Sequence, residues 1–206
     1  MSDVATSRSS RVPGILLLAS GLLAVAALAI PDAWPVVTAR AIDAMDVAHD
    51  LRAGYQLSSV LWALTGIGAL LGVCALGAYA GRPLVTTGVG VLSGGIVLWI
   101  VALITTSTNI LMSDAQGGTA KDLSYLVLGE IGHVLWLVAF LTMAAGFGVL
   151  VFALRDWGRW VCAAAALALV ILVAVVHDIP PFTVFLIALP ALGLASLTAK
   201  PAATAR

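Results

Sequence analysis

Long runs of apolar residues, separated by shorter polar connections, dominate the chain. They cover residues 14–30, 57–80, 84–106, 124–154, 160–176 and 182–197. A helix of about 20 apolar residues is long enough to cross the hydrocarbon core of a bilayer. The pattern therefore predicts an all-α fold, in which residues 1–206 form a single integral membrane bundle of about six transmembrane helices.

Two of these runs carry an additional feature. Pro190 interrupts the sixth run, which a membrane helix tolerates when its neighbours compensate for the lost backbone hydrogen bond. Arg8 and Arg11 precede the first run, and its last residues, up to Ala29, resemble a signal-peptidase site. The first run is thus interpreted as a membrane span, with a cleaved signal peptide as the alternative.

Residues 36–52 have a different pattern, because apolar and acidic positions fall on opposite sides of a helix. Asp43, Asp46 and Asp50 share one stripe. An acidic helix is not attracted to anionic lipid, so we expect it to cover one end of the bundle. Together with His49, these aspartates form a candidate site for a divalent cation, and the alternative is a solvated polar stripe.

The composition makes lipid the expected surroundings of the chain. Hydrophobic residues make up 62% of the sequence and charged residues 10%, and the mean hydropathy is +1.11. Soluble domains carry about 25% charged residues. The formal net charge is zero and no run of Lys or Arg occurs, which excludes a nucleic-acid partner on electrostatic grounds. Cys74 and Cys162 fall inside apolar runs and are interpreted as free thiols.

Basic residues are distributed unequally between the two sides of the predicted membrane. Of the ten Lys and Arg residues, three fall on one side: Arg40, Arg52 and Lys121. The other seven fall on the side that also holds both ends of the chain: Arg8, Arg11, Arg82, Arg155, Arg159, Lys200 and Arg206. Because cytoplasmic connections are enriched in Lys and Arg, we expect both termini to lie in the cytoplasm. We expect the membrane to be a bacterial plasma membrane.

Glycines spaced four residues apart occur in the second run and the residue directly after it, and in the third run: Gly68 and Gly72, Gly77 and Gly81, and Gly90 and Gly94. Small residues at this spacing allow membrane helices to approach closely. The pattern predicts a tightly packed bundle, with Gly72 and Gly94 at helix contacts. The same two helices are the candidate surface for a homo-oligomer or for a partner in a membrane complex.

Ionisable residues inside the apolar runs are the main candidates for chemistry. Glu130 and His133 lie three residues apart and so project from one face of the fourth helix. Helix lengths place them near the outer boundary of the membrane, at the same depth as His177 and Asp178 at the end of the fifth helix. Asn109, in the polar outer end of the third helix, belongs to the same level.

Several interpretations of this outer group remain open. It can be a proton or substrate site in a polar pocket between the third, fourth and fifth helices, since ionisable groups at membrane depth usually face the protein interior. A metal bound by Glu130, His133 and His177 is an alternative, as are haem ligation by the two histidines and simple interfacial anchoring.

The functional prediction follows from what the chain contains and lacks. Nucleophile motifs, phosphate loops and dinucleotide fingerprints are absent, which favours a non-enzymatic function without a cofactor. We therefore expect a protein that handles a small solute or ion, as a transporter or as the membrane subunit of one. The alternatives are a membrane-embedded metal or haem enzyme and an accessory subunit of a membrane complex.

Overall fold

The computed structural model describes residues 11–31, 50–80, 82–112, 119–154, 156–175 and 183–198. These residues are 93% helical and include no strand, so the predicted all-α class is confirmed. The helices are α2 (Val12–Leu28), α5 (Arg52–Ala80), α6 (Pro83–Met112), α7 (Thr119–Ala153) and α8 (Gly158–Val175). The last helix begins with a π-helical turn, η2 (Val184–Ala188), and continues as α9 (Leu189–Thr198).

Three of these helices are long and apolar enough to cross a membrane. The qualifying stretches are Arg52–Ala78 in α5, Pro83–Ser107 in α6 and Gly129–Ala153 in α7. The apolar helices at Val12–Leu28, Gly158–Ala174 and Val184–Thr198 are shorter. α5 and α7 each begin five residues before the corresponding apolar run, at Arg52 and Thr119. A helix can continue through polar residues once it has left the hydrocarbon core.

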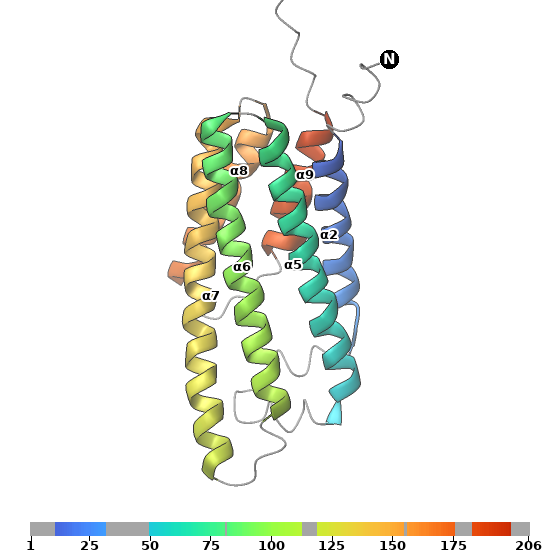
Figure 1. Ribbon diagram of the computed structural model, residues 1–206, viewed down its shortest axis with the longest axis vertical. Coiled ribbons are helices and arrows are strands. Elements are labelled where there is room, and N and C mark those ends of the chain that lie inside the picture. The colour runs from blue at the N-terminus through green and yellow to red at the C-terminus, as the bar shows by residue number, and fades with distance from the viewer. Residues whose placement is uncertain are drawn as a thin grey trace, which may run out of the picture.

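The helices form a closed ring in which each packs against its neighbours in the chain. The ring runs α2, α5, α6, α7, α8 and α9, and α9 returns to pack against α2. The junctions between α5 and α6 and between α7 and α8 lie at the same end of the bundle as the start of α2 and the end of α9 (Figure 1). We call this the turn end and the opposite end the loop end.

The helices are level at the turn end, so their difference in length appears at the loop end. At 1.5 Å per residue, the 17 residues of α2 and the 18 of α8 span about 25 and 27 Å. The 29, 30 and 35 residues of α5, α6 and α7 span about 43, 45 and 52 Å. α6 and α7 accordingly extend well past α8 and α9 in Figure 1.

Glycine allows the closest helix pair, α6 and α7, to pack backbone against backbone. A Cβ atom on Gly95 would lie 2.8 Å from the backbone nitrogen of Met143. A Cβ on Gly146 would lie 2.6 Å from the backbone nitrogen of Leu92. Leu92 and Met143 are fully buried, and the two helices therefore form the rigid centre of the core.

The two glycines chosen from the sequence have different surroundings. A Cβ on Gly72 would lie 2.8 Å from the Leu17 side chain of α2, so its prediction as a helix contact is confirmed. The prediction for Gly94 is wrong, because no atom of another described helix lies within 4 Å of the place where its Cβ would be. At 100° per residue, Gly95 faces α7, and this turns Gly94 toward the outside of the bundle.

Pro190 is accommodated by the π-helical turn before it. The Leu189 N–H bonds to the Val184 carbonyl, five residues back. Pro190 has no N–H to continue this pattern, so the π turn absorbs the missing bond. The proline ring packs directly against Gly21 of α2, where a Cβ would collide with it. Most of the predicted amphipathic helix at residues 36–52 lies outside the described residues.

Candidate functional site

Hydroxyl side chains gather between the helices toward the loop end of the bundle. Ser58 of α5 is buried and donates its Oγ–H to the Ala27 carbonyl of α2 at 3.2 Å. Ser107 of α6 donates to the Ser59 hydroxyl of α5 at 3.2 Å. Thr106 of α6 bonds to its own helix and contacts α7, since a Cβ on Gly132 would lie 2.9 Å from its Oγ1. We call Ser58, Ser59, Thr106 and Ser107 the hydroxyl layer.

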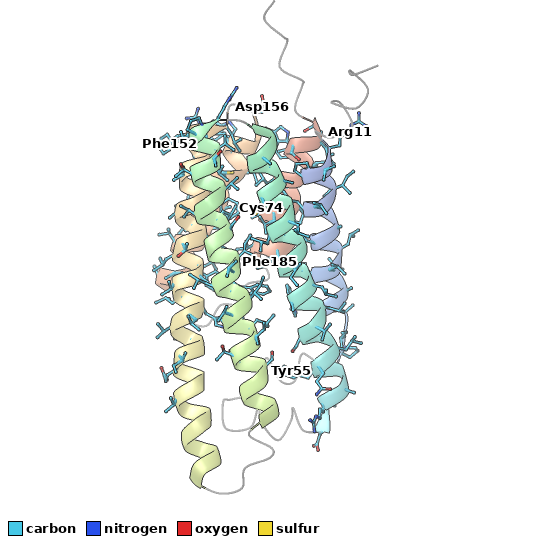
Figure 2. All side chains as sticks on the ribbon, in the orientation of Figure 1. Arg11, Tyr55, Cys74, Phe152, Asp156 and Phe185 are labelled. Carbon is cyan, nitrogen blue, oxygen red and sulfur yellow. The ribbon has the colours of Figure 1, made fainter. Side chains whose placement is uncertain are left out.

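Five aromatic side chains pack together in the bundle interior, next to the hydroxyl layer and nearer to the turn end. We call them the aromatic layer. Its members are Trp62 of α5, Trp99 of α6, Trp136 and Phe140 of α7, and Phe185 of η2. Trp99 lies at the centre, with ring centroids 6.1 Å from Trp62, 6.4 Å from Trp136 and 4.2 Å from Phe185. Figure 2 shows Phe185 at an intermediate height, between Tyr55 near the loop end and Cys74 nearer the turn end.

The interior beyond the aromatic layer is mostly apolar as far as the turn end. Leu17, Val73, Leu92, Met143 and Phe147 are all fully buried there. The buried hydroxyls at this depth bond to their own helices. Ser20 donates to the Leu17 carbonyl at 2.8 Å, and Thr65 donates to the Leu61 carbonyl at 2.9 Å. Ser93 of α6, which is only partly buried, lies 3.6 Å from the Cys74 thiol of α5. Among the buried hydroxyls of the described residues, the one that bonds to another helix, Ser58, lies on the loop-end side of the aromatic layer.

Glu130 and His133 lie on the outward-turned face of α7. Both side chains are exposed, and neither has a hydrogen-bond or ion-pair partner among the described residues. Gly132 and Ala139, on the opposite face, are buried. The two residues share a face, as their spacing requires, and the structure does not enclose them between α6 and α7.

Among the remaining candidates, only Asp50 has a described side chain. His177, Asp178, Asp43, Asp46 and His49 lie outside the described residues, as does the side chain of Asn109. Asp50 is described and its side chain is exposed. Within the described ranges, no group of three or more His, Cys, Asp or Glu side chains is arranged to hold a metal ion.

The loop-end layers contain residues that were not singled out from the sequence. Ser58, Ser59 and Trp62 lie on α5, and Phe185 lies on η2. A signal for two of them exists, because Ser58 and Trp62 are four residues apart and so share the buried face of α5. No local pattern marks Phe185, whose contact with Trp99 depends on the π-helical turn and on how the last helix closes the ring.

The turn end combines charge with indole rings at the bundle surface. The guanidinium of Arg159 lies 5.9 Å from the ring centroid of Trp160, which is 72% exposed. Trp157 donates its Nε1–H to the Thr198 hydroxyl at 2.9 Å and so links the α7–α8 turn to the end of α9. Arg11 and Asp156 lie at the same end (Figure 2). Exposed Trp beside Arg is typical of a membrane–water interface.

Comparison with known proteins adds no family assignment. No protein-family model matches the chain, and neither curated proteins nor solved structures give a match.

Proposed function

We propose that the chain is a multi-pass protein of a bacterial plasma membrane with six transmembrane helices. Three helices long enough to cross a membrane support this, and the three shorter apolar helices pack into the same ring. The shorter helices, about 22 to 27 Å long, approach the hydrocarbon thickness of about 30 Å. Their exposed surfaces carry large apolar side chains, such as Leu22, Leu167 and Ile187.

The turn end is the cytoplasmic side in this proposal, and both termini lie there. Arg11, Arg82 and Arg159 belong to this end, which agrees with the excess of Lys and Arg on the same side in the sequence. The exposed Trp157 and Trp160 would mark the inner interface. The loop end, where α5, α6 and α7 extend furthest, would then be extracytoplasmic.

The proposed activity is the handling of a small solute or ion, as a transporter or as the membrane subunit of one. The observation that carries it is the order of the layers, with the hydroxyl layer on the loop-end side of the aromatic layer. Hydroxyls that bond between helices can exchange those bonds for bonds to a solute. A plug of rings beneath them would hold the solute at that depth. This arrangement supports an outward-facing polar pocket.

Glu130, His133, His177, Asp178 and Asn109 are proposed as polar groups around the mouth of this pocket. The exposed side chains of Glu130 and His133 support a position at the headgroup level. Counting 24 residues back from Leu154 places Glu130 about 36 Å from the turn end, which is just beyond the hydrocarbon core. Gly132, which lies between them in the chain, contacts Thr106, so both groups are level with the hydroxyl layer, where a solute would reach the bundle.

Thiol accessibility tests the pocket directly. In a background with Cys74→Ala and Cys162→Ala, Ser59→Cys and Ser107→Cys should react with a charged, membrane-impermeant methanethiosulfonate added outside intact cells. The matched control is Thr65→Cys, which lies on the same helix as Ser59 but beyond Trp62 and is fully buried. Reaction at Ser59→Cys but not at Thr65→Cys supports the pocket. An unreactive Ser59→Cys and Ser107→Cys would contradict it.

A second candidate function, as an accessory subunit or a homo-oligomer, is favoured by the outer face of α6. Gly90 and Gly94 are exposed there and nothing lies within 4 Å of where their Cβ atoms would be. Val97 and Val101 continue the same exposed stripe. Two helices can pack closely through glycines at this spacing. Native mass spectrometry from nanodiscs distinguishes the candidates, because a monomer without a partner would contradict the accessory role.

A further inference from the structure

The start of α8 carries a cation without a carboxylate partner. Arg159 is exposed, and its guanidinium makes no ion pair with a described residue, including Asp156 three residues earlier. It lies 5.9 Å from the centroid of the Trp160 ring instead. A cation in the first turn of a helix opposes the helix dipole, so the charge of Arg159 does not stabilise α8. That charge is thus available to an anion from outside the described part of the chain.

Contacts with α9 hold the backbone that presents this cation. Trp157 donates its Nε1–H to the Thr198 hydroxyl at 2.9 Å. Gly158 is buried, and a Cβ on it would lie 3.2 Å from the Cβ of Ala195. The two residues directly before Arg159 are therefore fixed against the end of the last helix. A binding partner of the guanidinium would meet a group whose backbone is already ordered, which lowers the entropic cost of binding.

An exposed apolar stripe runs along α8 from this cation toward the middle of the bundle. Trp160, Ala164, Leu167 and Ile171 follow at intervals of four, three and four residues, so they share one face of the helix. The side chains of Trp160, Leu167 and Ile171 are 72%, 62% and 50% exposed. Ala164 is also exposed, and its small side chain leaves a dip in the stripe between two larger ones.

The length of the stripe matches one leaflet of a bilayer. At 1.5 Å per residue, the distance along the helix from Trp160 to Ile171 is about 17 Å. The hydrocarbon core of a bilayer is about 30 Å thick, so one leaflet contributes about 15 Å. In the proposed orientation, Arg159 is at the headgroup level of the cytoplasmic leaflet, and the stripe follows the acyl chains of that leaflet.

We propose that Arg159 and this stripe bind one anionic phospholipid of the leaflet at the turn end. The guanidinium donates charge-assisted hydrogen bonds to the lipid phosphate, and an acyl chain lies along the stripe over Ala164. The indole of Trp160 lies between the headgroup and the chains, where such rings are favoured. A zwitterionic headgroup adds an ammonium group that the guanidinium repels, so a lipid with net negative charge binds more tightly.

This proposal rests on the membrane orientation of the proposed function and goes beyond it. The ligand is a lipid, and it binds at the end of the bundle opposite to the outward-facing pocket. Thiol accessibility at Ser59 and Ser107 reports on the loop end, whereas lipid binding at Arg159 reports on the turn end. Failure of one proposal is therefore distinguishable from failure of the other.

Native mass spectrometry of the full-length protein in detergent tests the proposal. The probes are phosphatidylglycerol and phosphatidylcholine with the same acyl chains. The wild type should bind its first phosphatidylglycerol about three- to tenfold more tightly than its first phosphatidylcholine, the effect of one basic residue at an anionic membrane surface. Arg159→Gln should remove this preference. Arg82→Gln removes the same charge at the same end of the bundle and should keep it, because Arg82 contacts no aromatic ring among the described residues.

Three results would overturn the proposal. The first is equal binding of the two lipids by the wild type, which needs no variant to be measured. The second is a preference that survives Arg159→Gln, or that Arg82→Gln abolishes to the same extent, since the attraction would then belong to the surface charge in general. The third is displacement of the bound lipid by an equal concentration of glycerol 3-phosphate, which carries the phosphate without acyl chains and should not compete if the stripe contributes.

Discussion

Gly94 and Gly95 are adjacent residues of α6 with opposite surroundings, and substituting each by alanine tests the packing of the bundle. A Cβ on Gly95 would lie 2.6 Å from Met143 Cγ, 2.8 Å from Met143 N and 3.0 Å from Ala139 O. Two of these three atoms belong to the backbone of α7, so no side-chain rotation relieves the collision. A Cβ on Gly94 would meet nothing within 4 Å. The added methyl group therefore collides with the backbone of α7 at Gly95 and meets open space at Gly94.

The magnitudes follow from this difference. Inserting a methyl group into a packed core costs about 1–3 kcal/mol, and a collision with backbone puts Gly95→Ala at the upper end of that range. Alanine is favoured over glycine in a helix by up to about 1 kcal/mol, which partly offsets the loss at Gly95 and acts alone at Gly94. We expect Gly95→Ala to lower the free energy of unfolding by about 2 kcal/mol and Gly94→Ala to leave it unchanged or slightly higher.

Unfolding of both variants by sodium dodecyl sulfate in mixed micelles, followed by circular dichroism, measures the two free energies. Identical unfolding free energies for the two variants would refute the reasoning, because they would mean that α6 does not present Gly95 to α7. A large loss at Gly94 alone would instead indicate that the outer face of α6 is covered by another chain.

Two further predictions concern the α2–α5 contact and the polar pair on α7. Gly72→Leu should lower the melting temperature in detergent sharply, because even a Cβ at this position would lie 2.8 Å from the Leu17 side chain. Gly94→Leu is the matched control. Equal melting temperatures for the two variants would contradict the faces assigned to these glycines. A double-mutant cycle of Glu130→Gln and His133→Gln should give a coupling no larger than about 0.5 kcal/mol, as for an exposed pair three residues apart on a helix. A coupling above about 1 kcal/mol would place the pair in an enclosed site instead.

The positions of the helices could be predicted from the sequence because the apolar runs are long and their boundaries are marked. The turn around Arg82 and Pro83 and the turn after Leu154 occur where the pattern placed them. Helices joined by such short turns must run antiparallel, so the direction of each helix can be predicted. The directions in turn place Arg11, Arg82 and Arg159 at one end of the bundle. These features depend on local chemistry and on chain connectivity, both of which can be seen in the sequence.

The contacts across the ring could not be predicted in this way. Gly94 and Gly95 are indistinguishable in the sequence, and only the rotation of α6 against α7 decides which one is buried. Glu130 and His133 were expected to share a face, but their spacing does not tell which neighbour that face meets. Trp99 meets Phe185 only because the last helix closes the ring, 86 residues further along the chain.

Cysteine labelling at three connections and at one position after α9 tests most directly whether the bundle has six spans with both ends in the cytoplasm. Single cysteines would replace Gly117, Trp157, Asp178 and Ala203 in the background without Cys74 and Cys162. An impermeant maleimide added to intact cells should label positions 117 and 178, and should reach 157 and 203 only after the cells are permeabilised. Labelling of 203 from outside, or of 157 but not 117, would contradict the six-span arrangement.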